Sequence, residues 1–513
     1  MPIKTYIYKN CFRDSVYLMR LSSLIRELEG VEGAEVIIGT DHNKKFLETG
    51  GLWTKEIERE AESNDLIIAV RAVTEELAEE AISRALAELD REVEHEESVG
   101  EYIPRTLETA LKQLPGANLV LLSIPGQHVR READKALEAG LHVMIFSDNV
   151  SLQDEKELKQ KAEQKGLLVM GPDCGTAIIN GTPLAFANQV RAGKVGIVAA
   201  AGTGLQEVST LIHNYGEGIT HGIGTGGRDL NGEVGGITMR LGLKALIADP
   251  STEAIVIVSK PPEPQVAEKV LQVAAGSAKP VIVNFIGGSP EQVRSFGCEP
   301  ALTLKEAAAK AVAALRKESY RPEEMSTQTK QIIEKERSLM SGGQKYFRGL
   351  FSGGTLAYEA MILLQESLGG IYSNVSLDPR FALKDVYNSQ EHTIIDFGDD
   401  QFTQGRLHPM IDPTTRNQRI IAEAKDPQTA IIMLDLVLGY NAYSDPAGAA
   451  PEAIEEARKA AGGRHLVFVV SVCGTDDDPQ NRQEQIEKLT KKNVRVLPSN
   501  ADAALFAKAV LNS

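Results

Sequence analysis

The sequence predicts an α/β protein: several Rossmann-like or flavodoxin-like domains with parallel sheets, preceded by a small α/β unit at the N-terminus. Two observations predict this class. Short runs rich in Val, Ile and Leu alternate with amphipathic helical segments along most of the 513 residues, a pattern typical of parallel sheets with helices on both faces. Many of these runs are continuous, as expected for strands that are buried on both faces.

The apolar runs are the predicted strands. Met1–Asn10, a short apolar alternation with two lysines, is the first of them. The clearest continuous runs follow in chain order: Leu66–Val70, Leu119–Ser123, Val143–Phe146, Leu167–Met170, Val195–Ala199, Ala254–Val258, Pro280–Phe285, Ile394–Asp396, Ala430–Asp435 and Leu466–Val472.

Changes in composition mark the domain boundaries. Residues 87–106 are rich in Glu and Arg, which indicates a surface helix or a connection, and residues 316–343 are charged again, which indicates a linker helix. We therefore predict an N-terminal unit over 1–90, a Rossmann-type domain over 107–190 that could form one domain with it, a domain over 191–316, a linker over 317–345 and a last domain over 346–513.

Composition also excludes several classes of protein. No stretch approaches the roughly 20 apolar residues that span a bilayer, and the N-terminus lacks the pattern of a secretory signal. The net charge of −16 argues against sequence-independent nucleic-acid binding, which needs Lys and Arg to neutralise phosphates. We expect a cytoplasmic protein whose partners are small anions such as phosphate or a carboxylate, other protein subunits or further copies of itself, without nucleic acid or membrane.

The cysteines favour a reducing compartment. They lie far apart and have no CxxC spacing, so neither a structural zinc site nor a disulfide framework is indicated; they are Cys11, Cys174, Cys298 and Cys473.

Comparing the chain with itself indicates a duplicated domain. Residues 201–207, AGTGLQE, resemble residues 353–359, GGTLAYE, and residues 249–255, DPSTEAI, resemble residues 426–431, DPQTAI. Two matches in the same order argue for one α/β domain that is present twice. The second copy carries an insertion of about 25 residues near 371–389, because the two spacings differ.

Each copy of the first segment predicts an anion site. A strand that ends in small residues and is followed by a helix exposes backbone N–H groups and the positive end of the helix dipole. Thr203 and Thr355 would be the N-caps, although ordinary turn glycines and caps would have the same pattern. The candidate phosphate-binding residues are Gly202, Thr203, Gly204, Gly353, Gly354, Thr355 and Leu356.

Two further loops carry candidate substrate-binding residues. Gly226, Gly227, Arg228 and Asp229 follow the first anion loop, and Arg228 or Asp229 could hold an anionic substrate. In the second copy, residues 396–400 are followed by ionisable side chains in a loop with prolines, and a site and a solvated loop are both consistent with them; they are Arg406, His408, Asp412 and Arg416.

Acidic pairs raise the question of a metal. Asp399 and Asp400 could bind a divalent cation such as Mg²⁺, but aspartates at a strand end are also common turn and capping residues, and we assign no metal site. Asp476, Asp477 and Asp478 allow the same two interpretations. Cys473 has no visible base, which favours a small buried thiol over a nucleophile.

The motifs resemble succinyl-CoA synthetase. Residues 171–176, GPDCGT, and 193–203, GKVGIVAAAGT, look like its α subunit over about residues 119–315, and residues 348–513 look like the carboxy-terminal ligase domain of its β subunit. Taken whole, the chain resembles the FdrA family. That resemblance depends on residues 8–15, 146–150, 224–230, 259–262, 396–400 and 408–413.

Departures limit what the synthetase resemblance implies. The phosphorylated histidine of that family follows the strand equivalent to Pro280–Phe285, but no histidine lies between His221 and His392. Residues 1–90 lack the Gly-rich turn that opens the CoA-binding domain, and no ATP-grasp module is present. A self-sufficient CoA ligase that works through a phosphohistidine is therefore not expected.

What the FdrA resemblance implies is a subunit of a transferase. One member of that family is associated with oxamate carbamoyltransferase, which interconverts oxalurate and phosphate with oxamate and carbamoyl phosphate. On this hypothesis Arg228 and His408 contact substrate, with His408 as general acid or base, although a structural histidine fits equally. The alternatives are a subunit of an NDP-forming acyl-CoA synthetase, with CoA or a nucleotide as candidate cofactor, and a non-catalytic scaffold or anion sensor.

Overall fold

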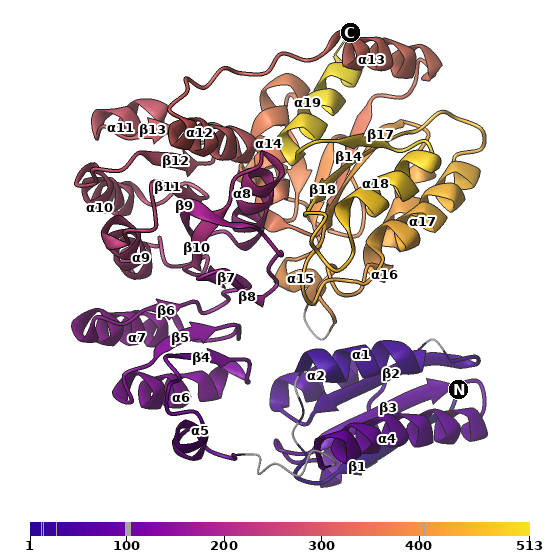
Figure 1. The fold of residues 1–513 in the computed structure, drawn as a ribbon. Helices are drawn as coiled ribbons and strands as arrows, with labels where there is room; N and C mark the ends of the chain where they lie inside the picture. The colour runs from indigo at the N-terminus through magenta and orange to yellow at the C-terminus, as the bar shows by residue number, and fades with distance from the viewer. Residues whose placement is uncertain (12, 14, 27, 98–103, 404–405, 513) are drawn as a thin grey trace. The chain divides into compact units, whose positions relative to one another are not determined.

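A computed structural model describes the chain except residues 12, 14, 27, 98–103, 404–405 and 513. It divides into two compact units. The first comprises Met1–Ala117 and Asp400–Leu407, and the second comprises Asn118–Asp399 and His408–Ser513 (Figure 1). No helix among the described residues is both long and apolar enough to cross a membrane.

The first unit is a small α/β layer with an antiparallel sheet. Its strands have the order β1-β3-β2, and β3 is antiparallel to both neighbours. Helices cover both faces, because Leu66, Ile68 and Val70 pack with the side of α1 and α4 while Ile67 and Ala69 pack with Ile57 of α3. The elements are β1 (Ile3–Tyr8), α1 (Ser15–Arg26), β2 (Val31–Ile38), α2 (Asp41–Thr49), α3 (Lys55–Glu60), β3 (Leu66–Ala72), α4 (Glu75–Glu97), α5 (Leu107–Gln113) and α15 (Asp400–Thr403).

The second unit opens with a short Rossmann-type layer. Three parallel strands have the order β4-β5-β6. Ser151 caps α7 by accepting the N–H of Asp154, and Gly166 ends that helix at a φ of 68°. The elements are β4 (Leu119–Leu122), α6 (Gly126–Glu138), β5 (His142–Ile145), α7 (Leu152–Lys165) and β6 (Val169–Met170).

The first large sheet of this unit has the order β13-β12-β11-β9-β10-β7-β8. Strands β9 to β13 pair in parallel, whereas β7 and β8 form an antiparallel ribbon at the edge. Its elements are β7 (Thr176–Ile179), β8 (Thr182–Ala185), β9 (Ala192–Ala199), α8 (Gly202–Asn214), β10 (Ile219–Gly224), α9 (Ile237–Ala248), β11 (Ala254–Ser259), α10 (Pro264–Ala275), β12 (Val281–Phe285), α11 (Pro290–Ser295), β13 (Glu299–Pro300) and α12 (Leu304–Arg316).

The second large sheet is fully parallel, with the order β15-β16-β14-β17-β18-β19. Strands β19-β18-β17-β14-β16 repeat the order of β13-β12-β11-β9-β10, so the two sequence repeats have one topology. Its elements are β14 (Tyr346–Phe351), α14 (Gly354–Leu368), β15 (Tyr372–Ser373), η1 (Pro379–Phe381), β16 (Thr393–Asp396), α16 (Thr414–Ala424), β17 (Thr429–Val437), α17 (Pro446–Ala460), β18 (Val467–Cys473), α18 (Arg482–Lys491), β19 (Arg495–Leu497) and α19 (Asn500–Leu511).

The sequence predictions of the fold class are confirmed. Every run that the sequence predicts as a strand overlaps a strand of the structure. The predicted insertion contains β15 and η1, between α14 and β16. Of the charged segment 87–106, residues 87–97 belong to α4, and residues 98–103 lie outside the described residues.

The predicted linker contains a helix that docks on the second repeat. Helix α13 spans Thr327–Leu339, and its buried Glu336 pairs with His465 at 2.5 Å and with Arg495 at 2.5 Å. These ion pairs attach the connecting helix to the strand ends of the second sheet.

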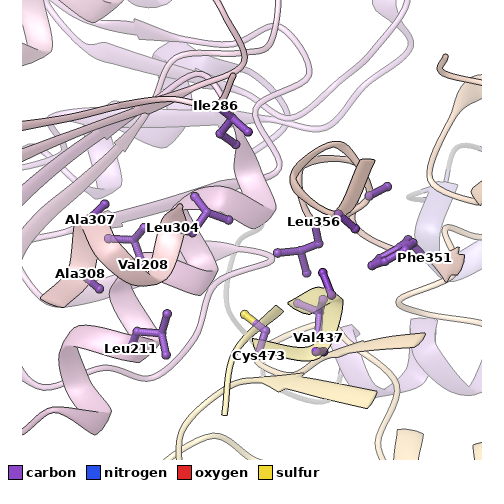
Figure 2. Close-up of a cluster of buried hydrophobic side chains, with 14 of the residues drawn as sticks. Val208, Leu211, Ile286, Leu304, Ala307, Ala308, Phe351, Leu356, Val437 and Cys473 are labelled. Atoms are coloured by element: carbon purple, nitrogen blue, oxygen red, sulfur yellow. The ribbon is translucent and has the colours of Figure 1, made fainter. Parts of the chain in front are cut away.

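One apolar core joins the two repeats. Helices α8 and α14 contact each other, α12 packs along α8, and α19 packs along α14. Figure 2 shows part of this core, with Val208 and Leu211 of α8 grouped with Leu304 of α12, and Leu356 of α14 grouped with Val437 of β17. Because the core is continuous between the repeats, the two helix starts are held at fixed positions with respect to each other.

Candidate functional site

The two predicted anion loops meet. The backbone N–H of Thr355, in the first turn of α14, donates to Oγ1 of Thr203, in the first turn of α8, at 3.3 Å. Both threonines are buried, whereas Gly202 is exposed and Gly354 is half-buried. The first turns of both helices therefore lie together and reach the surface at their glycines.

The prediction that the two threonines are N-caps is wrong. The N-caps are Ala201 and Gly353, whose backbones are extended and whose side chains provide no capping hydrogen bond. Each threonine lies two residues further in, where the Thr203 hydroxyl contacts the other repeat instead of its own helix. Among the described residues, no protein acceptor meets the N–H groups of Gly202, Thr203 and Gly204.

A buried carboxylate occupies the start of α14. Asp435, at the end of β17, accepts the N–H groups of Ser352 and Gly353, both at 2.7 Å. Arg416 of α16 pairs with Asp435 at 3.1 Å and also donates to the Ser352 hydroxyl. Burial raises the pKa of Asp435 and lowers that of Arg416. For Arg416 the sequence was consistent with both a site and a solvated loop; the residue lies in α16 and is 2% exposed, which rules out the solvated loop.

A second carboxylate, Asp396, lies at the end of β16. Its Oδ1 accepts the N–H of Gly398 at 2.9 Å. Its Oδ2 lies so close to Gly354 that a Cβ on that glycine would approach it to 2.5 Å. Asp396 is 6% exposed, and burial raises its pKa to about 7. Glycine at 354 is thus required for the carboxyl group to reach the helix start.

Lys260 is an exposed cation in this region. It follows β11, is exposed, and lies 5.3 Å from the ring centroid of Tyr358, one turn into α14. Its charge lowers the pKa of Asp396, against the larger effect of burial. Sequence reasoning did not select Lys260 as a site residue, although a lysine directly after a predicted strand of the duplicated domain was the available signal.

His408 lies beside the same loops. A Cβ on Gly398 would approach its Nε2 to 2.8 Å, and its ring is 5.9 Å from that of Phe186. Its Nδ1 accepts the N–H of Met410 at 3.2 Å, so the neutral ring carries its proton on Nε2. Burial lowers the pKa of His408 to about 4. At neutral pH this histidine is therefore a neutral hydrogen-bond donor.

Arg228 and Asp229 are engaged with the Rossmann-type layer. Arg228 pairs with the buried Glu155 of α7 at 2.9 Å and donates to the carbonyl of Val150. Asp229 is buried, pairs with Lys159 at 2.8 Å and accepts the N–H groups of Thr238 and Met239 at the start of α9. This network anchors the loop after β10.

The glycines of that loop differ from each other. Gly226 has a φ of 82°, and a Cβ there would approach the carbonyl of Pro172 to 2.4 Å, so it permits a close backbone contact. Gly227 faces open space.

The remaining acidic residues lie apart: in the described part of the chain, no three His, Cys, Asp or Glu side chains are grouped as metal ligands. Asp399 belongs to the second unit and Asp400 opens α15 in the first. Asp478 is buried and accepts hydrogen bonds from Asn188, Gln189 and Thr475. Burial raises the pKa of Cys473 well above its usual value, in agreement with an inert thiol.

Comparison with known proteins gives matches to three family models. One described as "AllF, heavy metal-associated domain" matches residues 1–103, one described as "CoA binding domain" matches 190–287, and one described as "CoA-ligase" matches 350–510.

A heavy metal does not fit the first of these segments. It contains one cysteine, Cys11, which is buried and whose pKa burial raises. The part of the chain that the structure describes has no group of three His, Cys, Asp or Glu able to hold a metal.

The CoA-binding match covers β9 to β12 of the first repeat and not the three-stranded layer β4–β6. Within the matched residues, β9 is followed by a short turn and by α8, whose first turn contains Gly202 and Gly204, a strand–turn–helix of the kind that binds phosphate groups.

Several curated relatives and solved structures are similar. Residues of this chain are 27% identical to the succinate–CoA ligase [ADP-forming] subunit alpha-2 of Trichomonas vaginalis, over 35% of this chain and 60% of that protein. They are 26% identical to the ADP-forming sulfoacetate-CoA ligase subunit SqwL of an Acholeplasma species, over 33% and 58%. The crystal structure of PH0766 from Pyrococcus horikoshii covers 80% of this chain and 86% of its own, at 15% identity and a TM-score of 0.34.

A relative of full length settles the family. Protein YahF of Escherichia coli K12 is 43% identical over 99% of this chain and 98% of its own length. Together with the AllF-type match over residues 1–103, this similarity shows that the chain belongs to the FdrA family.

Proposed function

We propose that this chain is the subunit of a transferase that handles an acyl- or carbamoyl-phosphate, and that its reaction interconverts oxalurate and phosphate with oxamate and carbamoyl phosphate. The observation that carries the proposal is the meeting of the α8 and α14 starts, where Thr355 donates to Thr203. Backbone N–H groups of two helices at one place can stabilise a phosphoryl group without a covalent residue.

The two helix starts have different charges around them, and we assign them different roles. Asp435 already accepts the N–H groups of Ser352 and Gly353 directly before α14, whereas the N–H groups of Gly202, Thr203 and Gly204 meet no protein acceptor among the described residues. We therefore assign phosphate to the start of α8, with the exposed Lys260 as its counter-ion. The neutral His408, with its proton on Nε2, would donate to the substrate.

The test is phosphate-dependent breakdown of oxalurate by the full chain together with the products of its neighbouring genes. Formation of carbamoyl phosphate and oxamate in equal amounts is the expected result. Lys260→Met should raise the KM for phosphate at least about tenfold, because it removes the cation that faces the dianion. Arg380→Met removes an exposed arginine that pairs with Asp378 and serves as the matched control. An unchanged KM in Lys260→Met would contradict this assignment.

A second candidate is a subunit of an NDP-forming acyl-CoA synthetase. It is favoured by the CoA-ligase match over residues 350–510 and by two of the relatives, which are subunits of ADP-forming CoA ligases. Its discriminating test is thioester formation that depends on CoA and a nucleotide, measured in the same reconstituted mixture. Thioester formation without carbamoyl phosphate would replace the first proposal with this one.

A further inference from the structure

We propose that Asp396 is the residue that moves the proton in this site, and that His408 does not. The inference deepens the proposed function and rests on it. It starts from the position of Asp396 at the end of β16, 6% exposed, with Oδ2 against Gly354 at the start of α14.

The hydrogen bonds of Asp396 leave one oxygen available. Oδ1 accepts the N–H of Gly398, and the backbone of Asp396 is held by Asn374 on both its N–H and its carbonyl. Among the described residues no donor meets Oδ2. A carboxyl group with one oxygen fixed and the other oxygen aimed at the helix start is positioned as a proton donor and acceptor.

The charged groups that face Asp396 come from every element around it. Lys260, after β11, favours the ionised carboxylate, whereas Asp399, in its own loop, and Asp435, on β17, oppose it. Desolvation is the largest effect, and together they raise the pKa of Asp396 to about 7. A group that titrates near the working pH can give and take a proton.

His408 has the opposite properties. Burial and the neighbouring Arg416 lower its pKa to about 4, so its imidazole is neutral and binds a further proton only in acid. In a neutral site it can donate a hydrogen bond from Nε2, and a Cβ on Gly398 would approach this Nε2 to 2.8 Å and Oδ1 of Asp396 to 3.1 Å. The two residues therefore lie close together, but they lose their protons in different pH ranges, and so we assign them different roles.

Atoms and protons are conserved in the proposed proton-transfer step. An oxygen of hydrogen phosphate attacks the carbamoyl carbon of oxalurate and forms the C–O bond of carbamoyl phosphate, while the C–N bond to the oxamate nitrogen breaks. Asp396 gives its proton to that nitrogen, and then receives the proton of hydrogen phosphate. The carboxyl group ends the step protonated, as it began, and no oxidant, reductant or further reactant takes part.

Asp396→Asn tests this role in the reconstituted transferase. We expect kcat to fall at least about 100-fold, because the amide keeps the shape but carries no transferable proton. The wild-type rate should decline as pH rises through about 7, where Asp396 loses its proton, and the variant should lack that limb. Glu366→Gln, which removes an exposed carboxylate from α14, is the matched control and should keep the wild-type profile. A kcat within threefold of wild type, or an unchanged pH profile, would overturn the inference.

A binding measurement separates this inference from the proposed function. Calorimetry on the full chain with inorganic phosphate needs no turnover. Because phosphate itself changes charge near neutral pH, the readout is the difference in phosphate affinity between wild type and Asp396→Asn. Wild-type affinity should fall relative to the variant as pH rises from 6 to 8 (roughly the range in which Asp396 ionises), because the carboxylate repels the dianion. If the phosphate affinities of wild type and variant change in parallel with pH, the inference is overturned, even where carbamoyl phosphate is formed. If the two affinities diverge but no carbamoyl phosphate is formed, only the proposed reaction is overturned.

Discussion

The carboxyl ends of the two repeated sheets differ in charge, although their strands have the same order. In the first repeat, Gly224 pairs with Ala199; in the second, Asp396 pairs with Phe351 at the equivalent position. At the end of the neighbouring strand, the residue beside the helix start is Val258 of β11 in the first repeat and Asp435 of β17 in the second.

This difference shows how one duplicated fold can provide two unlike halves of a site. The first repeat keeps an apolar strand edge and a helix start whose N–H groups remain available for an anion. In the second repeat, the carboxylate of Asp435 accepts hydrogen bonds directly before the helix, and the carboxyl group of Asp396 lies beside the helix start. On the proposed function, the same backbone would provide both an anion site and a proton-transfer group, because the repeats differ at a few strand-end residues.

Removing the charge that fills the second helix start should have the largest effect. Asp435→Ala leaves Arg416 buried without its partner and leaves two N–H groups without an acceptor. We expect a loss of about 3–5 kcal/mol in the free energy of unfolding, measured by urea denaturation. The double variant Asp435→Leu with Arg416→Met removes both charges and should recover much of that loss. A double variant less stable than the single one would show that the pair itself is stabilising.

A buried glutamate makes the contact between the repeats sensitive to pH. Glu359 and Glu207 each lie four residues after the helix threonine, and each accepts a backbone N–H of the other repeat's last helix, from Leu304 or Asn500. Burial raises the pKa of Glu359 from 4.5 to about 7. Its stabilising contribution is therefore present below pH 4.5 and is lost as pH rises through about 7.

Glu359→Gln should remove that pH dependence. Relative to wild type, its free energy of unfolding should increase by the order of 2–3 kcal/mol between pH 5 and pH 8, measured by denaturation at each pH. Glu366→Gln, on the same helix but exposed, should show no such change. A constant difference between Glu359→Gln and wild type over this range would mean that Glu359 is ionised throughout.

Much of the fold could be predicted from the sequence, because continuous apolar runs and the two repeated segments are local signals. The site was predictable only in part. The loops at 202–204 and 353–356 were found because glycines and threonines recur at one spacing, but the Asp435–Arg416 pair joins residues of different elements and has no local pattern. The pKa values of His408 and Asp396 depend on burial, which the sequence around them does not reveal.

The glycines of the two helix starts offer a matched pair. A Cβ at Gly354 would approach Oδ2 of Asp396 to 2.5 Å, whereas a Cβ at Gly202 would meet Oγ1 of Thr176 at an ordinary 3.4 Å. Gly354→Ala should therefore displace the carboxyl group and lower kcat about tenfold or more, a cost near 1.4 kcal/mol. Gly202→Ala should keep the wild-type kcat within about threefold. Equal effects of the two variants on kcat would show that the contact between residue 354 and the Asp396 carboxyl group has no particular importance for the reaction.

The two helix threonines should differ by the smallest amount. The hydroxyl of Thr203 accepts the N–H of Thr355, so Thr203→Val leaves that buried N–H without an acceptor and should cost about 1–2 kcal/mol in unfolding free energy. The hydroxyl of Thr355 has no corresponding protein partner among the described residues, and Thr355→Val, its mirror image, should cost under about 0.5 kcal/mol. Urea denaturation of both variants gives the comparison directly. Equal losses would mean that the repeats contact each other symmetrically in solution, and the division of roles between the two helix starts would have to be abandoned.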